Sequence, residues 1–442
     1  MKDKLTALPV RGDSFVLQRA GRTIMVDSGW EGLELAKSLD SYLPEVDKIN
    51  IAVCTHNDMD HAGGFTSLLD HWSPCFTGTS DDLIEEFWLP GKWVEVVPDL
   101  LTKAHEFADC LIQELDDFIE DNPNLALDIK GSNSADDFFY SPEKSYQGKY
   151  QAEVNLQKGA DYSKKEDATQ QDLQESEWME DLRALAEDII AEEAASLRAL
   201  ANARARVRYR KRKNKISPAF SEFWLSLIDA ADRIRKIAHT AIKYSIKIRW
   251  FDFDEFLNLG DSSGGVPNIL IPVNAVEQTP IPTGFSLGHI LFLSMHNRKC
   301  LSFFSPPNTS QIAQFCPGVL FCGDSPMGSG RDYKNSFLSS LKSPQWPWLP
   351  VYVTAPHHGS ESNAVAYDHI SNWLGNNEIV WLRSGGGAKH PGTTYRTLSQ
   401  GIRLCTHCPR KNLPKALIDI TFKYGITWPF SPILQVGHKC NC

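Results

Sequence analysis

The chain has 442 residues, of which 42% are hydrophobic, so it can bury a sizeable core, and its length suggests two or three domains. There is no run of about 18 apolar residues and no apolar stretch at the start, so we expect neither a membrane span nor a secretory signal, and we predict a cytoplasmic protein. The formal charge of −10 excludes a generally basic nucleic-acid-binding surface but not a local basic patch.

Residues 1–96 are predicted to form the first half of a layered α/β domain. Short apolar segments at residues 14–17, 22–26 and 48–53 indicate strands separated by glycine-containing turns. Residues 65–72 indicate a helix, so strands and helices alternate as in an α/β sandwich.

Four potential metal ligands follow the strand at residues 48–53. They are His56, Asp58, Asp60 and His61. Side chains this close on a tight loop can converge on one point, and imidazole with carboxylate suits Zn, Mn or Fe. Gly63 and Gly64 allow the backbone to turn steeply into the next helix. The loop is therefore a candidate metal site, the alternative being a polar loop that holds these residues by chance.

Residues 97–245 differ in composition and are predicted to be a helical insertion. Apolar residues recur at helical spacing in residues 101–120, 171–206 and 220–242, the second as one long helix. Residues 122–165 are polar and predict a loop or a disordered segment.

A basic loop is predicted at residues 204–215, between the last two of these helices. The candidate nucleic-acid contacts there are Arg204, Arg206, Arg208, Arg210, Lys211, Arg212 and Lys213. The loop could be a phosphate-contacting arm, since such a cluster can hold a polynucleotide by counterion release. It could equally be a solvated helix end that pairs with the preceding acidic run, or an exposed, protease-sensitive hinge of an insertion that caps the site.

Residues 246–400 are predicted to return to the α/β domain. Strand-like segments lie at residues 246–251, 269–272, 289–293 and 300–304.

Residues 401–442 form a separate C-terminal segment that contains cysteines. Without a secretory signal, the ten cysteines of the chain are expected to be thiols or metal ligands. One tetrahedral zinc site could be built from Cys405, Cys408, Cys440 and Cys442. The alternative is a set of free, partly buried thiols.

The ligand loop resembles the metal-binding motif of the metallo-β-lactamase superfamily, with Asp58 where a second histidine is usual. The closest resemblance is to one branch of this superfamily, the nuclease-like domain of ComEC-type competence proteins. Three further segments resemble that branch in the same order along the chain: residues 21–29, residues 319–325 with Gly-Asp, and residues 356–360 with His-His-Gly-Ser. This resemblance implies an α/β fold, a metallo-β-lactamase-like αββα sandwich, here with a large helical insertion between its two halves.

The resemblance implies two divalent metal ions, Mn²⁺ or Zn²⁺. Their implied ligands are His56, Asp58, Asp60, His61, Asp324 and His358. The first two would hold one ion and the next two the other, while Asp324 bridges and His358 completes the second site. A carboxylate at Asp58 favours Mn²⁺ relative to an all-histidine site. The third ligand of the first ion is unassigned, and His296 is one candidate.

Three residues are candidates for catalysis: Asp60, His357 and His390. His357 could bind the phosphate or protonate the leaving oxygen, or it could orient its neighbour. His390, in a late His-Pro pair, could touch substrate or close its loop. Asp27 could hold the ligand loop or cap a turn.

The expected function is a metal-dependent phosphodiesterase, with a DNA nuclease favoured. A cytoplasmic role such as defence against foreign DNA would fit, with activity regulated through the insertion by a protein or protease. The alternative is a metallo-hydrolase of a small phosphodiester or other small ester, with the insertion as a lid. A third possibility is a scaffolding protein that keeps the site only to stabilise its fold. The oligomeric state is left open.

Overall fold

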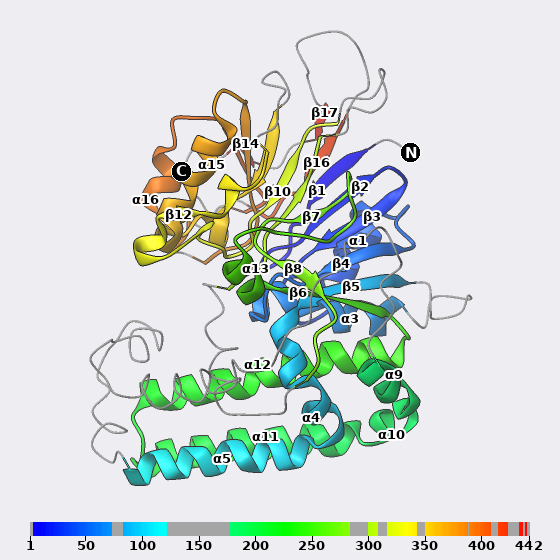
Figure 1. Cartoon of the computed structure of the whole chain (residues 1–442), viewed down its shortest axis with the longest axis vertical. Helices are drawn as coiled ribbons and strands as arrows, with labels where there is room; N and C mark the ends of the chain where they lie inside the picture. Colours follow the sequence, from blue (N-terminus) through cyan, green and yellow to red (C-terminus); the bar gives the residue numbers. More distant parts are fainter. Residues whose placement is uncertain are drawn as a thin grey trace. The chain divides into compact units, whose positions relative to one another are not determined.

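The computed structural model describes most of the chain as two compact units (Figure 1). The described residues are 3–72, 83–121, 177–282, 299–307, 316–342, 350–387, 389–407, 414–422, 433–435 and 438–439. Unit 1 comprises Met1–Trp93, Lys236–Pro280 and His296–Cys442, and unit 2 comprises Val94–Arg235 and Ile281–Met295. None of the described helices is long and apolar enough to cross a membrane.

Unit 1 contains a mixed sheet of nine strands within the described residues. In spatial order they are β17 (Ile433–Gln435), β16 (Ile418–Thr421), β1 (Lys4–Ala7), β2 (Phe15–Arg19), β3 (Arg22–Val26), β4 (Ile49–Val53), β5 (Ile84–Pro90), β6 (Lys247–Asp252) and β8 (Val276–Gln278). The strands β3 to β6 run parallel, so their carboxyl ends share one edge of the sheet.

The second sheet of unit 1 has seven described strands. Their order is β18 (His438–Lys439), β15 (Ile402–Cys405), β14 (Ile379–Arg383), β13 (Val351–Thr354), β10 (Val319–Phe321), β9 (Phe303–Ser305) and β7 (Ile271–Pro272). The strands β10, β13, β14 and β15 are parallel, and the buried, largely apolar residues of β10, β13 and β14 suit a sheet covered on both faces. A short pair, β11 (Gly328–Ser329) and β12 (Asn335–Ser336), stands apart.

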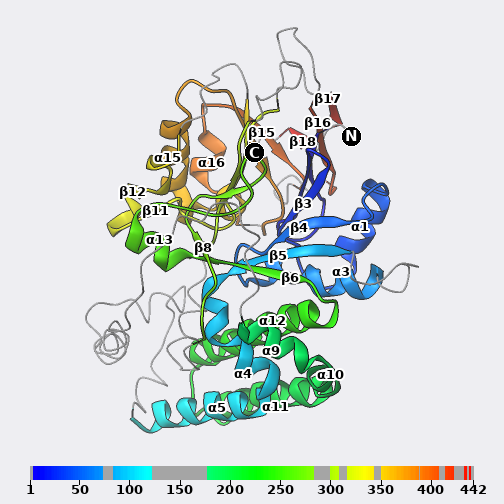
Figure 2. The same cartoon turned by 45° about the vertical axis from the view of Figure 1, so that its right-hand side comes forward.

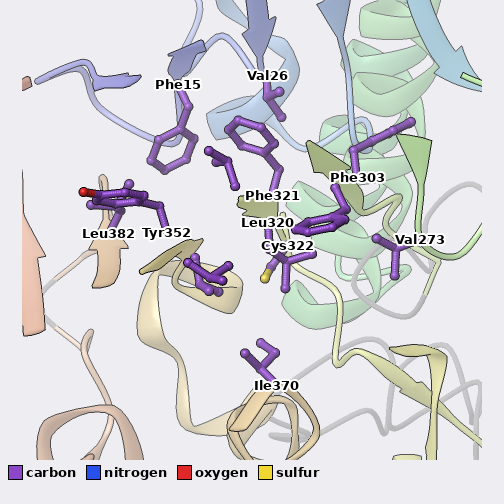
Figure 3. Close-up of a cluster of buried hydrophobic side chains, with 14 of the residues drawn as sticks. Phe15, Val26, Val273, Phe303, Leu320, Phe321, Cys322, Tyr352, Ile370 and Leu382 are labelled. Carbon is purple, nitrogen blue, oxygen red and sulfur yellow. The ribbon is translucent and has the colours of Figure 1, made fainter. Parts of the chain in front are cut away.

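The core of unit 1 lies between the two sheets. Figure 3 shows Phe15 and Val26 of the first sheet facing Phe321 of the second, and the rings of Phe15 and Phe321 are 6.2 Å apart. In Figure 2, α1 (Glu34–Tyr42) and α3 (Gly64–Trp72) lie beside the first sheet, and α15 (Ala364–Leu374) and α16 (Thr393–Thr397) beside the second. The shorter helices are α2 (Met59–Ala62) and α13 (Phe253–Leu259). Unit 1 is thus a mixed α/β structure, consistent with the expected sandwich.

Unit 2 is helical in its described part. Its helices are α4 (Val97–Thr102), α5 (Ala104–Asp121), α9 (Glu177–Ala184), α10 (Ala186–Ala191), α11 (Glu193–Arg212) and most of α12 (Pro218–Lys243). The prediction of one long helix over residues 171–206 is wrong, because the described part breaks at Leu185 and Glu192. The prediction of a basic loop over residues 204–215 is also wrong, because helix α11 continues to Arg212.

Two predicted strands are shorter or shifted. The strand predicted at residues 269–272 is limited to Ile271–Pro272, and the one at residues 300–304 becomes Phe303–Ser305. The predictions for residues 122–165 and 289–293 lie outside the described residues.

Candidate metal centre

The ligand loop leaves the carboxyl end of β4, as expected. Its start is fixed by hydrogen bonds from Cys54 N to Trp88 O (3.0 Å) and from Leu301 N to Thr55 O (3.0 Å). A Cβ atom at Gly64 would lie 2.2 Å from Ser28 O, so only glycine allows this close approach after the loop.

Two strand ends of the second sheet bring further ligands. Asp324 follows β10 after Gly323, which has a φ of 53°. His357 and His358 follow β13 in a tight turn with φ values of 46° and 52°. Because β10 and β13 are parallel, both turns emerge at the same edge of the sheet.

Asp324 lies at the centre of the ligand atoms. Its Oδ1 is 3.1 Å from His61 Nε2, and its Oδ2 is 3.6 Å from His56 Nε2. His357 Nε2 is 3.5 Å from the same Oδ2. One carboxylate therefore faces both halves of the ligand loop.

Two groups of ligand atoms within the described residues are compact enough to hold a metal ion. One group is His56, Asp58 and Asp324, and the other is Asp13, His61, Asp324 and His358, each with its ligand atoms within 4.8 Å of one another. Asp60 adjoins the second group, since its Oδ2 is 2.9 Å from His358 Nε2. The six ligands expected from the sequence thus lie together.

The Nδ1 atom of each of three ligand imidazoles is held by an oxygen. The partners are Asp27 for His61 (2.7 Å), Asp13 for His358 (3.0 Å) and Thr55 for His56 (2.9 Å). Asp27 also accepts hydrogen bonds from the backbone N and the hydroxyl of Thr55. A proton held at Nδ1 leaves the Nε2 lone pair for a metal ion and fixes the ring orientation.

The donor set fits divalent metal ions. The buried Nε2 atoms of His56 and His61 and the buried Oδ1 of Asp324 have no hydrogen-bond partner within the described residues. The His61 and Asp324 atoms are 3.1 Å apart but are not aligned as a hydrogen bond. Since buried polar atoms are rarely left without partners, a cation bound among them would supply the missing interactions.

Asp13 is a site residue that the sequence did not indicate. It is buried, and its backbone N donates to Asp60 O (2.8 Å) while its carboxylate faces His358 Nδ1. In the sequence it follows Gly12 in a turn between two strands, where aspartate is common for local reasons.

Asp13→Asn is expected to weaken metal binding by about 10- to 100-fold. The Asp13 carboxylate orients the His358 ring and makes that imidazole more basic, and the substitution removes its charge. Competition with a fluorescent chelator measures the affinity, and Asp368→Asn, at an exposed position of α15, is the control. An unchanged affinity in Asp13→Asn would show that this contact does not support the ligand.

The carboxylates strongly shift the pKa values of the ligand histidines. Burial and His56 lower the pKa of His61, but Asp324 and Asp27 outweigh them and hold it well above its ordinary value. Burial likewise lowers the pKa of His358, and Asp13 and Asp60 more than reverse this. For Asp324, burial raises the pKa, but the nearby histidines, His61 first, hold it well below its ordinary value.

Metal binding is expected to strengthen as the pH rises above about 6.5, because each imidazole must lose its proton to bind a cation. Without metal, protonation of these histidines stabilises the fold, because their pKa values are higher in the folded state than in the unfolded state. This stabilisation is complete below the unfolded-state pKa of about 6.5 and is lost as the pH rises through the folded-state pKa values. The gain in melting temperature on adding Mn²⁺ to chelator-treated protein should therefore grow between about pH 6 and pH 8.5. A constant gain over this range would contradict the expected proton competition.

His357 and His390 lie at the more open side of the cluster. The ring of His390 is 5.5 Å from that of His357 and 6.0 Å from that of His358. Burial, followed by the charges of these two histidines, lowers the pKa of His390 to about 4, so it is neutral at neutral pH. Ser362 Oγ is 3.3 Å from His357 Nδ1.

Cys300 is a second residue that the sequence did not indicate. Its buried Sγ accepts a hydrogen bond from Asp324 N (3.0 Å) and lies 3.5 Å from His56 Nδ1. Cys300 therefore contacts the Nδ1 side of the His56 ring and the backbone of Asp324, and so supports two of the expected ligands. The candidate ligand His296 lies outside the described residues.

A comparison with protein families agrees with this geometry. Residues 7–99 match the family model of the metallo-beta-lactamase superfamily. The match covers Asp13, Asp27 and the whole ligand loop, and superfamily members are generally metal-dependent hydrolases. No curated protein matches the chain. The match and the compact ligand groups together support a metal-dependent hydrolase, whereas the resemblance to the ComEC-type branch stays a prediction.

The basic segment, which lies outside the superfamily match, is largely paired within unit 2. Arg204 binds Asp229 (2.6 Å) and Asp232 (2.8 Å) of α12. Its other pairs are Arg206 with Asp109 (2.8 Å), Arg210 with Asp116 and Lys211 with Glu222 (3.8 Å). Arg208, Arg212 and Lys213 are exposed.

The predicted structural zinc site is only partly described. Cys405 is buried at the end of β15, next to Arg383 Nε (3.4 Å). Cys408, Cys440 and Cys442 lie outside the described residues, so the zinc site stays a prediction.

Proposed function

We propose that the protein is a metal-dependent phosphodiesterase that cleaves nucleic acid, with DNA the favoured substrate. The observation that carries the proposal is the oxygen-rich ligand set: Asp58, Asp60 and Asp324 share the cluster with three histidines. Oxygen ligands suit the hard divalent cations that phosphodiester chemistry uses.

His56 and Asp58 would hold one ion, and Asp60, His61 and His358 the other, with Asp324 between them. Two bound cations would activate a water molecule and offset the charge of the phosphodiester. The side chains of Asp58 and Asp60 are 31% and 32% exposed, so they form the accessible side of the cluster, where substrate would enter.

The protein's own proton-carrying groups fit this reaction. His357 is partly exposed and lies beside Asp324, so it can bind a phosphate oxygen or hand a proton to the leaving oxygen. Neutral His390 can accept a hydrogen bond from substrate, because its lowered pKa of about 4 keeps it uncharged. Asp60 contributes to catalysis as a ligand.

We also propose that exposed residues of the basic segment, residues 204–215, contact the nucleic acid. Arg208, Arg212 and Lys213 are exposed, and so is Arg206, which pairs with Asp109, whereas Arg204 and Arg210 are partly buried in ion pairs. Each free cation that meets a phosphate would add to the salt dependence of binding.

We also propose that nuclease activity is regulated through unit 2. The proposed biological role is defence against foreign DNA. The turn after α11, residues 213–215, is exposed, and Asn214 there has a φ of 53°. Such a turn is accessible to a protease or a regulatory protein.

The test is cleavage of plasmid DNA, single-stranded DNA, RNA and bis(p-nitrophenyl) phosphate with Mn²⁺, Mg²⁺ or Zn²⁺. The control is the double variant Asp60→Ala, His61→Ala. Metal-dependent cutting of a polynucleotide that the control lacks would support the nuclease. Hydrolysis of the small diester alone, even after limited proteolysis at residues 204–215, would favour the small-phosphodiester hydrolase.

A further inference from the structure

Arg11 and Trp30 form a stacked pair beside the metal centre. The guanidinium carbon of Arg11 lies 3.5 Å from the centre of the Trp30 ring. Arg11 is exposed and Trp30 is partly exposed, so the pair is on the surface of unit 1. The pair comes from two loops, one between β1 and β2 and one after β3.

Backbone hydrogen bonds tie these two loops to the ligand loop. Asp13 N donates to Asp60 O (2.8 Å), Gly29 N to Asp13 O (2.8 Å) and Trp30 N to Arg11 O (2.9 Å). Gly12 approaches so closely that a Cβ there would be 2.1 Å from Asp60 O. Arg11 is two residues from Asp13, which limits the distance between their Cα atoms to about 7 Å. The loop that carries Arg11 therefore lies against the ligand loop at Asp60, whose side chain is partly exposed.

The charge of Arg11 is available to a ligand. Its guanidinium has no ion pair within the described residues, whereas Glu34 binds the backbone N of Arg11 (3.0 Å) and also Lys415. The neighbouring Glu31 pairs with Lys236 (2.9 Å). Stacking on the indole holds the guanidinium plane but leaves its N–H edge open, which is the geometry that binds phosphate oxygens.

We infer that Arg11, held by Trp30, binds the backbone phosphate next to the scissile phosphodiester of a polynucleotide. This rests on the proposed function and narrows it, because a polynucleotide has a neighbouring phosphate that can reach this position, whereas a substrate with a single phosphate does not. It also gives a chain with a formal charge of −10 a local cation near the metal centre. Trp30 orients the guanidinium and presents an indole against which a nucleotide can pack.

The test compares a single-stranded oligonucleotide with bis(p-nitrophenyl) phosphate as substrates. Arg11→Ala should raise the KM for the oligonucleotide about tenfold more than the KM for the small diester, and should lower the salt dependence of oligonucleotide binding by about one counterion. Arg11→Lys keeps the charge but not the planar edge, so its KM should be intermediate. Arg22→Ala, at an exposed position of β3, is the matched control.

Equal effects of Arg11→Ala and Arg22→Ala on the oligonucleotide, in wild-type protein that cleaves it, would overturn the inference and leave the nuclease standing. Equal effects of Arg11→Ala on both substrates would also overturn it. Wild-type protein that cleaves neither substrate with any divalent metal would overturn the proposed function itself. Retained metal content in Arg11→Ala establishes that the centre is intact.

Discussion

Asp324→Ala should lower phosphodiesterase activity by about 1,000-fold or more. Asp324 is the carboxylate that faces His56, His61 and His357 together, so its loss removes a ligand from both groups. Metal ions supply several kcal/mol of transition-state stabilisation, and each 1.36 kcal/mol is about a tenfold change in rate. Initial rates with the substrate that wild-type protein prefers measure the effect.

The control for this variant is Asp368→Ala, which removes an exposed carboxylate from α15 and should keep full activity. Asp324→Asn tests the charge alone, because the amide removes the negative charge but fills the same space as the carboxylate. A rate within about threefold of wild type in either Asp324 variant would show that this residue does not hold a catalytic cation, since loss of such a ligand costs several kcal/mol.

Trp381→Ala should destabilise unit 1 by about 3–5 kcal/mol, the range for removing a large aromatic side chain from a packed core. Trp381 is fully buried in β14, packs against Tyr367 at a ring distance of 5.3 Å and donates from Nε1 to Gln400 O (3.1 Å). Urea unfolding followed by circular dichroism measures the loss.

Trp381→Phe keeps most of the apolar volume and should cost less than Trp381→Ala. By contrast, Tyr209→Ala, at an exposed position of α11 in unit 2, should change the free energy of unfolding by no more than about 0.5 kcal/mol. A loss below about 1 kcal/mol in Trp381→Ala would contradict the position of β14 in the core.

The ligand loop could be predicted because its chemistry is local. His56 to His61 lie within one turn after a strand whose apolar residues are contiguous, so spacing alone indicated a site. Asp324 and His358 could be added because each follows a short apolar strand in a segment that resembles the family. Asp13 and Cys300 could not, because their contacts with His358 and His56 span 345 and 244 residues.

In unit 2, the helical spacing of apolar residues did not predict where the helices end. Residues 177–212 keep a helical apolar pattern, but no glycine or proline marks the breaks at Leu185 and Glu192. The basic residues were predicted to lie in a loop between two helices, with a solvated helix end that pairs with the preceding acidic run as an alternative. Their helix is instead stabilised by carboxylates of other helices: Asp232 of α12, 28 residues from Arg204, and Asp116 of α5, 94 residues from Arg210.

The most direct test of the central claim is the metal content of purified protein, measured by inductively coupled plasma mass spectrometry after dialysis with limiting Mn²⁺ or Zn²⁺. We expect two ions per chain in wild type and fewer in Asp58→Ala and Asp60→Ala, with the Asp368→Ala control unchanged. Wild-type protein that binds no divalent metal, or ions that remain after both ligand substitutions, would contradict a metal centre at this loop.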